Sequence, residues 1–380
     1  MSADFLLVDN EPAVLELSSK IAALGACDFI SLDTEFLRVV TYYPKLCLAQ
    51  LCIDGTTYLA DPVKTDIRRV IEALLYTKAT VLVFSGSEDI EILADLARVY
   101  QLSRLSPENC IDIQTMCGFA EKSTAFSLRS CVKEFLGIEL EKSETRSDWS
   151  QRPLTREQLE YSVLDVFYLK DLYDCLIQDL SPVKLGWLKA EMQEILLRYS
   201  SRPSLEEAYL NIAGAGTLNE KELKRLKFLC SRRLEFAVGH DEALNRIITT
   251  SALCSIAREK PQSSHDLAEC HMKWGAIRQY GSMVLDWVKQ ADRQPYEAVR
   301  LPYDYFSSKG EYKDAYRRLK HLVESCCVKA GISPELLKQK RLLNDYFYAL
   351  HYGATPKLLS SWRQEVIGAI SFERLMSSGS

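Results

Sequence analysis

The sequence Ser31-Leu32-Asp33-Thr34-Glu35 closes an apolar run that begins at Phe29, a pattern that predicts a β-strand. Side chains two residues apart on a strand share a face, so Asp33 and Glu35 project together. Two carboxylates this close repel each other unless a proton or a cation lies between them. An Asp-x-Glu pair taken alone is common on protein surfaces, so its meaning depends on the rest of the chain.

The residues around this stretch predict a mixed α/β domain. Short apolar or alternating runs predict strands at 29–32, 46–53, 57–60 and 80–84, with a turn at Asp54-Gly55. Helical patterns occupy 66–76, 87–99, 126–136 and 155–180. The short connections among the first three strands favour an antiparallel meander, and the helix at 66–76 favours a crossover to the strand at 80–84.

Further carboxylates lie at the ends of predicted elements. Thr155 has the spacing of a capping box at the start of a helix, and Tyr161 and Asp165 fall one turn apart on one face of it. Asp89 follows the strand at 80–84, in the first turn of the next helix. Each has a purely structural alternative: Asp89 suits the helix dipole, and Tyr161 can pack half-buried beside a solvated Asp165.

Together, Asp33, Glu35, Asp89 and Asp165 would form an oxygen-rich cage for two hard divalent cations, Mg²⁺ or Mn²⁺. Two such ions can activate a water and stabilise the leaving oxygen of a phosphodiester. None of the five histidines lies in residues 1–180, so this part cannot use a histidine base or ligand. Tyr161 could orient the attacking water, but with an ordinary pKa near ~10 it is a poor base.

Composition limits the class of protein. The chain has 380 residues, 47% of them hydrophobic and 26% charged, which suits a soluble protein of two or three domains. No apolar run approaches the ~18 residues of a membrane span, and the start of the chain lacks the pattern of a signal peptide. The 12 cysteines include no Cys-x-x-Cys pair. These features argue against a membrane, secreted or disordered protein, and we expect a cytoplasmic one.

The second half of the chain differs from the first in charge and in pattern. Residues 1–180 carry 17 Lys and Arg against 29 Asp and Glu, whereas residues 181–380 carry 30 against 23. From about residue 205 nearly every segment has a helical pattern, and 199–204 and 291–302 are candidate linkers. The basic excess hints at nucleic-acid contact, although it also fits an ordinary solvated surface.

The N-terminal part resembles the bacterial ribonuclease D family in three motifs. The first comprises Leu32–Phe36, Thr41–Pro44, Leu48–Leu51 and Asp61-Pro62. The second comprises Gly86–Glu91 and Ile111–Thr115, and the third comprises Ser147–Leu154 followed by Tyr161 and Asp165. The resemblance implies a ribonuclease-H-like α/β exonuclease of the tyrosine-containing DEDD branch. It also implies that Asp33, Glu35, Asp89 and Asp165 bind two Mg²⁺ ions and that Tyr161 positions the water.

Two helical regions extend the resemblance. Residues 223–237, 253–258 and 277–281 resemble the HRDC domain, a module named for helicases and ribonuclease D. Residues 331–337 and 359–368 are similar to the C-terminal region of the family, where a second HRDC-like domain lies. We therefore expect an exonuclease domain at 1–200, followed by two small all-α HRDC-type domains at 205–290 and 300–374.

The predicted function is a metal-dependent 3′→5′ exoribonuclease that releases nucleoside 5′-monophosphates from single-stranded RNA 3′ ends. The family resemblance points to transfer-RNA precursors, and Trp149 and Arg152 are candidates to stack on or clamp the terminal nucleotide. We expect a monomer that needs no protein partner or membrane. A DNA exonuclease with the same metal site stays open, because only contacts to the 2′-OH separate the two. A scaffold with a decayed site is the other alternative.

Overall fold

The computed structural model describes residues 5–140, 147–295, 298–370 and 372–376. Its contacts divide the chain into two compact units. The first unit contains Met1–Leu37, Pro44–Ser201 and Cys327–Leu336. The second contains Arg38–Tyr43, Arg202–Cys326 and Leu337–Ser380. Each unit is described by itself below.

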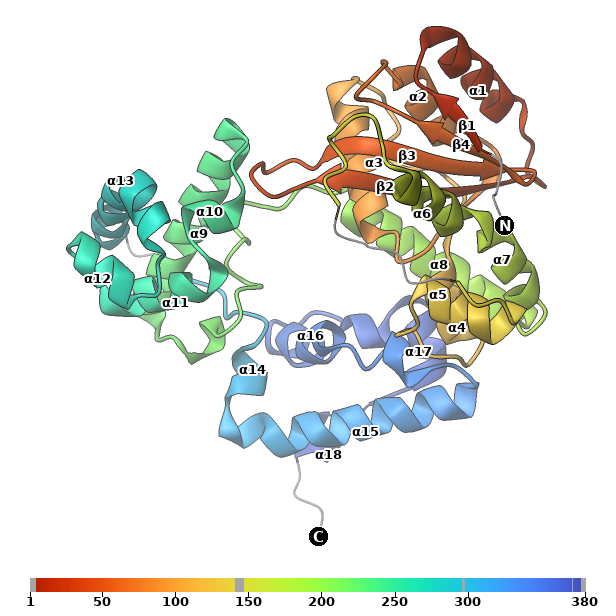
Figure 1. Ribbon diagram of the computed structural model, residues 1–380. Helices are drawn as coiled ribbons and strands as arrows, with labels where there is room; N and C mark the ends of the chain where they lie inside the picture. The colour runs from red at the N-terminus through yellow and green to blue at the C-terminus, as the bar shows by residue number, and fades with distance from the viewer. Residues whose placement is uncertain (1–4, 141–146, 296–297, 371, 377–380) are drawn as a thin grey trace. The chain divides into compact units, whose positions relative to one another are not determined.

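The first unit is built on a six-stranded sheet with the order β1-β4-β3-β2-β5-β6 (Figure 1). The strands are β1 (Phe5–Val8), β2 (Phe29–Leu37), β3 (Lys45–Ile53), β4 (Thr56–Ala60), β5 (Thr80–Val83) and β6 (Cys110–Asp112). The predicted meander is confirmed, because β3 pairs antiparallel with both β2 and β4. The predicted crossover is confirmed as well, because β5 pairs parallel with β2. The edge strands β1 and β6 were not predicted.

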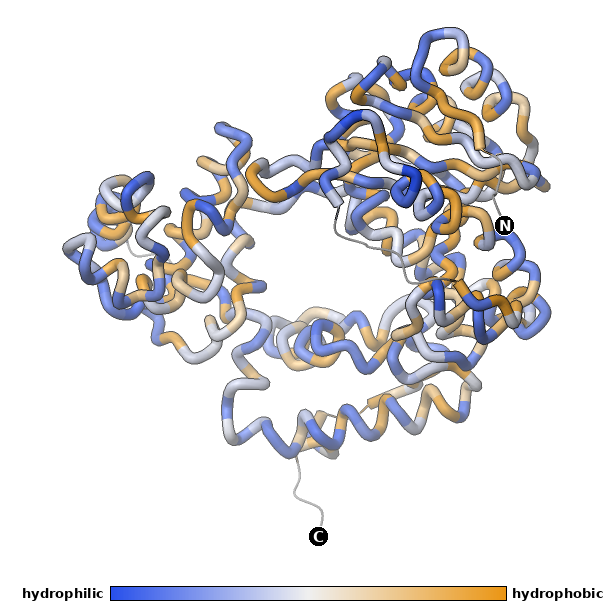
Figure 2. Tube along the Cα trace, in the orientation of Figure 1, coloured by the Kyte–Doolittle hydropathy of each residue, from blue (hydrophilic) through white to orange (hydrophobic). Residues whose placement is uncertain are grey.

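The central strands carry apolar residues on both faces. In β3, every residue from Leu46 to Ile53 is buried, as expected for a strand covered on both sides. Figure 2 shows apolar residues concentrated along β2 and β3. In the pairing of β2 with β3, Asp33 lies opposite Gln50 and Glu35 opposite Leu48. This register fixes which residues surround the Asp-x-Glu pair.

Helices cover the sheet. They are α1 (Glu11–Ala23), α2 (Arg68–Tyr76), α3 (Ser87–Val99), α4 (Ile113–Phe119), α5 (Leu128–Cys131) with a π-helical turn (Val132–Leu136), α6 (Arg156–Phe167), α7 (Leu169–Ile177) and α8 (Pro182–Tyr199). Helix α6 packs on β2, β3 and β4, and α7 packs on β2 and β5 (Figure 1). The single helix predicted at 155–180 is wrong, because the chain breaks at Tyr168 into α6 and α7.

A segment from far along the chain completes the first unit. The carboxylate of Glu335 accepts hydrogen bonds from the backbone N–H and hydroxyl of Thr124 and from the hydroxyl of Ser123. The backbone N–H of Ser333 donates to the carbonyl of Gly118 at 2.7 Å. Part of the predicted third domain therefore packs with the sheet-bearing unit. The domain boundaries at 1–200, 205–290 and 300–374 stay predictions.

The described residues of the second unit form helices and no strand. The helices are α9 (Glu220–His240), α10 (Leu244–Ile247), α11 (Thr250–Glu259), α12 (Ser264–Glu269), α13 (Trp274–Arg293), α14 (Tyr305–Ser308), α15 (Lys313–Ala330), whose last four residues belong to the first unit, α16 (Lys340–His351), α17 (Ser361–Ile367) and α18 (Phe372–Met376). The short 3₁₀ turns of this unit lie at Ala215–Thr217, Gly310–Tyr312 and Lys357–Leu359, and a further one at Pro334–Leu336 belongs to the first unit. In the part of the chain that the structure describes, every helix is too short or too polar to cross a membrane.

Candidate active site

Strand β2 presents the first two carboxylates on the face that α6 covers. Ile30 and Leu32 are buried on the other face, so the period-two alternation turns Asp33 and Glu35 toward α6. Immediately after Glu35, the pairing of β2 with β3 shifts its register between Glu35 and Phe36. The side chains of Asp33 and Glu35 therefore lie between β2 and α6.

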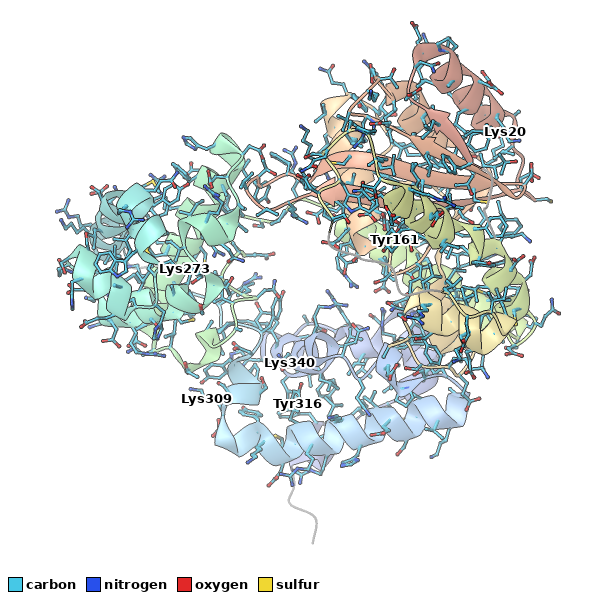
Figure 3. The ribbon with its side chains drawn as sticks, in the orientation of Figure 1. Lys20, Tyr161, Lys273, Lys309, Tyr316 and Lys340 are labelled. Atoms are coloured by element: carbon cyan, nitrogen blue, oxygen red, sulfur yellow. The ribbon has the colours of Figure 1, made fainter. Side chains whose placement is uncertain are left out.

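Helix α6 carries Asp165, the third carboxylate, and Tyr161, which is labelled in Figure 3. Its start is fixed by the predicted capping box, in which the hydroxyl of Thr155 accepts from the backbone of Gln158 and the Gln158 side chain accepts from the backbone of Thr155. Tyr161 and Asp165 lie one turn apart, and each shifts the pKa of the other. The two side chains reach the site as one unit.

Oxygen atoms of Asp33, Glu35 and Asp165 lie within 4.8 Å of one another. One oxygen of Asp165, Oδ2, is buried and has no hydrogen-bond partner among the described residues. A buried carboxylate oxygen without a donor is costly, and a cation would satisfy it. The ligand atoms are all carboxylate oxygens, a set that fits hard divalent cations.

Asp89 enters from a tight turn between β5 and α3. Its Oδ1 accepts a hydrogen bond from the hydroxyl of Thr34 at 2.5 Å, and only 6% of the residue is exposed. Gly86 is needed in the turn, because a Cβ at this position would lie 2.4 Å from a side-chain carbon of Val83. A favourable interaction with the dipole of α3 does not by itself explain the placement of Asp89, because its side chain points to Thr34 of β2 rather than to solvent.

The carboxylate of Asp112 stabilises the turn between β5 and α3. It accepts from the backbone N–H groups of Ser85 and Gly86 and also caps α4. Ser85 has a positive φ of 56°, an unfavourable conformation for a residue with a side chain. The Asp112 carboxylate thus stabilises the backbone conformation that places Asp89.

Burial and repulsion from nearby carboxylates raise the pKa of all four acids, the repelling neighbours of Asp89 being Asp112 and Glu88. Burial is the largest cause for each. The pKa of Glu35 rises to about 8, that of Asp89 to about 6 and that of Asp165 to about 7, while that of Asp33 rises well above its usual value. A cation among these groups would reverse the shifts by favouring the ionised carboxylates.

The raised pKa values predict how the metal-free protein responds to pH. Each folded-state pKa lies above its unfolded value, so the contribution of these groups to stability is most favourable below about pH 4 and falls as pH rises toward 8. We expect the melting temperature in EDTA to drop between pH 5 and 8, and Mg²⁺ to reduce that drop. Thermal unfolding of the wild type and of Glu35→Gln tests this. A drop of equal size in the variant would contradict it.

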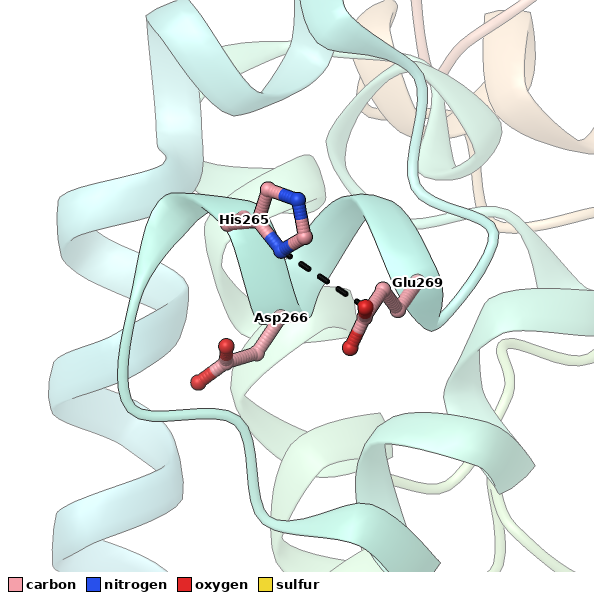
Figure 4. A group of neighbouring side chains, drawn as sticks. All are labelled: His265, Asp266 and Glu269. Carbon is pink, nitrogen blue, oxygen red and sulfur yellow. Dashed lines mark ion pairs between the residues drawn. The ribbon is translucent and has the colours of Figure 1, made fainter.

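A second group of possible metal ligands lies on the surface of α12 (Figure 4). His265 and Glu269 are exposed and their side chains approach to 3.6 Å. The carboxylate of Asp266 accepts from the backbone N–H groups of Gln262 and Ser263, which closes a capping box at the helix start. These contacts account for the group as a helix cap with an exposed surface pair.

The structure places Trp149 and Arg152 differently from the catalytic candidates. Trp149 is only 3% exposed, packs with Cys47, Leu48 and Leu59, and has its ring 6.0 Å from that of Tyr161. The Arg152 guanidinium is hydrogen-bonded within the protein. Contact of these two residues with nucleic acid stays a prediction. In the structure, the side chains of both residues contact other residues of the first unit.

Three family models match the chain. A 3′-5′ exonuclease model matches residues 8–181, an HRDC domain model matches 222–288, and a model of the ribonuclease D C-terminal HRDC domain matches 310–370. Ribonuclease D of Escherichia coli is 31% identical over 96% of each chain. The chain belongs to the ribonuclease D family. It is a 3′→5′ exoribonuclease, and this family depends on divalent metal ions.

Solved structures agree with this assignment. The crystal structure of Escherichia coli RNase D matches with a TM-score of 0.82 and 29% identity over 98% of each chain. The catalytic core of RRP6 from Trypanosoma brucei matches with a TM-score of 0.56 and 22% identity over 76% of this chain and 80% of its own, a likeness of fold alone. The predicted ribonuclease-H-like α/β fold followed by HRDC domains is confirmed.

Sequence reasoning did not assign roles to three polar residues around this ribonuclease D site. Thr34 lies between the two acids of β2, and Asp61 and Asp112 occur in the quoted motifs without a function. Asp112 carried one local signal, because Asp is a preferred N-cap residue, although no helix was predicted where α4 begins after it. The partners of Asp61 and Thr34 lie 91 and 55 residues away, so no local pattern could identify them.

Proposed function

We propose that this chain removes nucleoside 5′-monophosphates from RNA 3′ ends with two divalent cations held by Asp33, Glu35, Asp89 and Asp165. The observation that carries the proposal is the cluster of the half-buried Asp33, Glu35 and Asp165, whose carboxylate oxygens lie within 4.8 Å of one another, with Oδ2 of Asp165 left without a donor among the described residues. When bound, Mg²⁺ or Mn²⁺ would acidify a water and stabilise the leaving 3′ oxygen.

Tyr161 acts as a hydrogen-bonding group that orients the water. Burial and the neighbouring Asp165 raise the pKa of its phenol above the ordinary value of 10, so the hydroxyl keeps its proton at neutral pH. A protonated phenol can donate a hydrogen bond but cannot act as a base.

Single-stranded 3′ ends of transfer-RNA precursors are the substrates that we propose. The similar RNase D of Escherichia coli is an exoribonuclease involved in structured RNA processing. Residues 181–380 of this chain have an excess of Lys and Arg, which would supply salt-sensitive affinity for phosphates. We also propose that the protein acts as a monomer in the cytoplasm, where such precursors occur.

A comparison of RNA with DNA tests the substrate class. A 5′-labelled single-stranded RNA and its DNA counterpart are incubated with Mg²⁺ or with EDTA, using wild type and Asp89→Ala. We expect a ladder that shortens from the RNA 3′ end and disappears with EDTA and with the variant. The inactive variant controls for contaminating nuclease. Equal or faster digestion of the DNA would favour the DNA exonuclease instead.

A further inference from the structure

A buried ion pair lies beside the start of α6. The guanidinium of Arg152 contacts the carboxylate of Asp61 through two bonds, Nε to Oδ2 at 2.5 Å and Nη2 to Oδ1 at 2.7 Å. The two side chains are 11% and 7% exposed. A two-bond contact of this kind fixes the orientation of both planar groups.

The remaining donors of Arg152 bind backbone carbonyls of separate segments. Nη2 donates to the carbonyl of Cys47 in β3 at 2.6 Å. Nη1 donates to the carbonyls of Trp149 and Gln151, each at 2.7 Å. All five N–H groups of the guanidinium are therefore used within the protein. This one side chain joins β3, the residue that follows β4, and the loop that leads into α6.

Asp61 is itself held in place. Its backbone N–H donates to the carbonyl of Val8 in β1 at 3.0 Å, and its Oδ1 accepts from the backbone N–H of Val63 at 2.9 Å. The carboxylate that receives Arg152 is thus fixed to the sheet. The ion pair ties the loop before α6 to a rigid support.

The Arg152–Asp61 ion pair is connected to the catalytic candidates through Trp149. Trp149, whose carbonyl binds Arg152, packs against the ring of Tyr161 and against Leu48. Leu48 lies opposite Glu35 in the pairing of β3 with β2. Between Arg152 and Tyr161 the chain contains only Pro153, Leu154, the N-cap residue Thr155 and the first five residues of α6. A displacement of the loop would therefore move α6 across the sheet.

We infer that Arg152 is a positioning residue, whose guanidinium, held by Asp61, sets the place of α6 on the sheet so that Tyr161 and Asp165 meet Asp33 and Glu35. The inference rests on the proposed function of these four residues. It gives Arg152 a role distinct from the contact with nucleic acid that its place in the sequence suggested. The two roles predict different kinetics.

Arg152→Lys separates the two roles. Lysine keeps the positive charge but is a point donor that cannot reach Asp61 and three carbonyls together. For a positioning residue, we expect kcat to fall about 10- to 100-fold, since a shift near 1 Å in a reacting group has an effect of this size. KM and the dependence of KM on salt should stay within about threefold of wild type. A residue that grips phosphate would instead raise KM and flatten its salt dependence.

A second variant and a matched control complete the experiment. Asp61→Asn should lower kcat to the same extent, and the double variant should be little worse than either single one. Arg225→Lys is the control, because Arg225 is also a buried arginine and pairs with Asp292, whose side chain is 43% exposed, at 2.7 Å in the second unit. We expect it to lower the melting temperature without changing kcat.

The outcomes distinguish this inference from the proposed function. The kinetics are measured on whichever nucleic acid the wild type degrades, well below each variant's melting temperature, so a preference for DNA would overturn the substrate proposal alone. A raised KM with unchanged kcat in Arg152→Lys would overturn the positioning role in favour of nucleic-acid contact. Unchanged kcat and KM in both Arg152→Lys and Asp61→Asn would overturn it as well.

Discussion

Replacing Asp165 with asparagine lowers kcat at least about 1,000-fold, a loss of about 4 kcal/mol of transition-state stabilisation. The reason is that Asp165 contributes to the oxygen cluster with Asp33 and Glu35 and also interacts with Tyr161, whose pKa it raises. An amide keeps the shape of the side chain but loses the charge that attracts a divalent cation. Single-turnover degradation of labelled RNA measures the effect.

The control for this variant is Asp171→Asn. Asp171 is an exposed carboxylate on the neighbouring helix α7, and we expect its loss to leave the rate unchanged. Asp165→Asn should also raise the melting temperature of the metal-free protein at pH 8, because it removes one of several repelling charges. A variant that keeps more than a tenth of the wild-type rate would show that Asp165 is not a metal ligand.

Replacing Tyr161 with phenylalanine lowers kcat about 100-fold, the lower end of the range for a group that assists proton transfer or orients water. The change removes only the hydroxyl, and the ring can keep its packing against Trp149. We therefore expect little change in the melting temperature. Rates over the pH range 6 to 10 measure the effect on both kcat and its pH dependence.

The shape of the pH profile decides the role of Tyr161. Since the raised pKa keeps the phenol protonated, the variant should show the wild-type profile at a uniformly lower rate. A rise in rate at alkaline pH that is present in wild type and absent in Tyr161→Phe would contradict this account. Such a result would assign the phenolate as the base.

Much of the fold could be predicted because its long elements carry strong local patterns. The apolar run at 46–53 and the capping box at Thr155 correspond to β3 and to the start of α6. The edge strand β6 has only three residues, and β1, with four, has two exposed residues and so lacks the continuous apolar run of β5. No Gly or Pro marks the break between α6 and α7 at Tyr168, so one helix was predicted where two occur.

The site divides in a similar way. The spacings of Asp33 with Glu35 and of Tyr161 with Asp165 follow from the periods of strand and helix. Sheet order and register bring these two pairs and Asp89 into one site, and local spacing predicts neither. Their grouping was therefore inferred from the family resemblance. The supports of the site, such as the pair of Asp61 with Arg152, depend on contacts 91 residues apart in sequence and were not predicted.

The measurement that tests the central claim most directly is anomalous scattering from a crystal of the protein soaked in Mn²⁺. The account predicts two peaks about 3.5–4 Å apart, held by oxygens of Asp33, Glu35, Asp89 and Asp165. Soaking an Asp165→Asn crystal under the same conditions should weaken at least one of the two peaks. Strong Mn²⁺ peaks elsewhere, with none among these four carboxylates, would contradict the account.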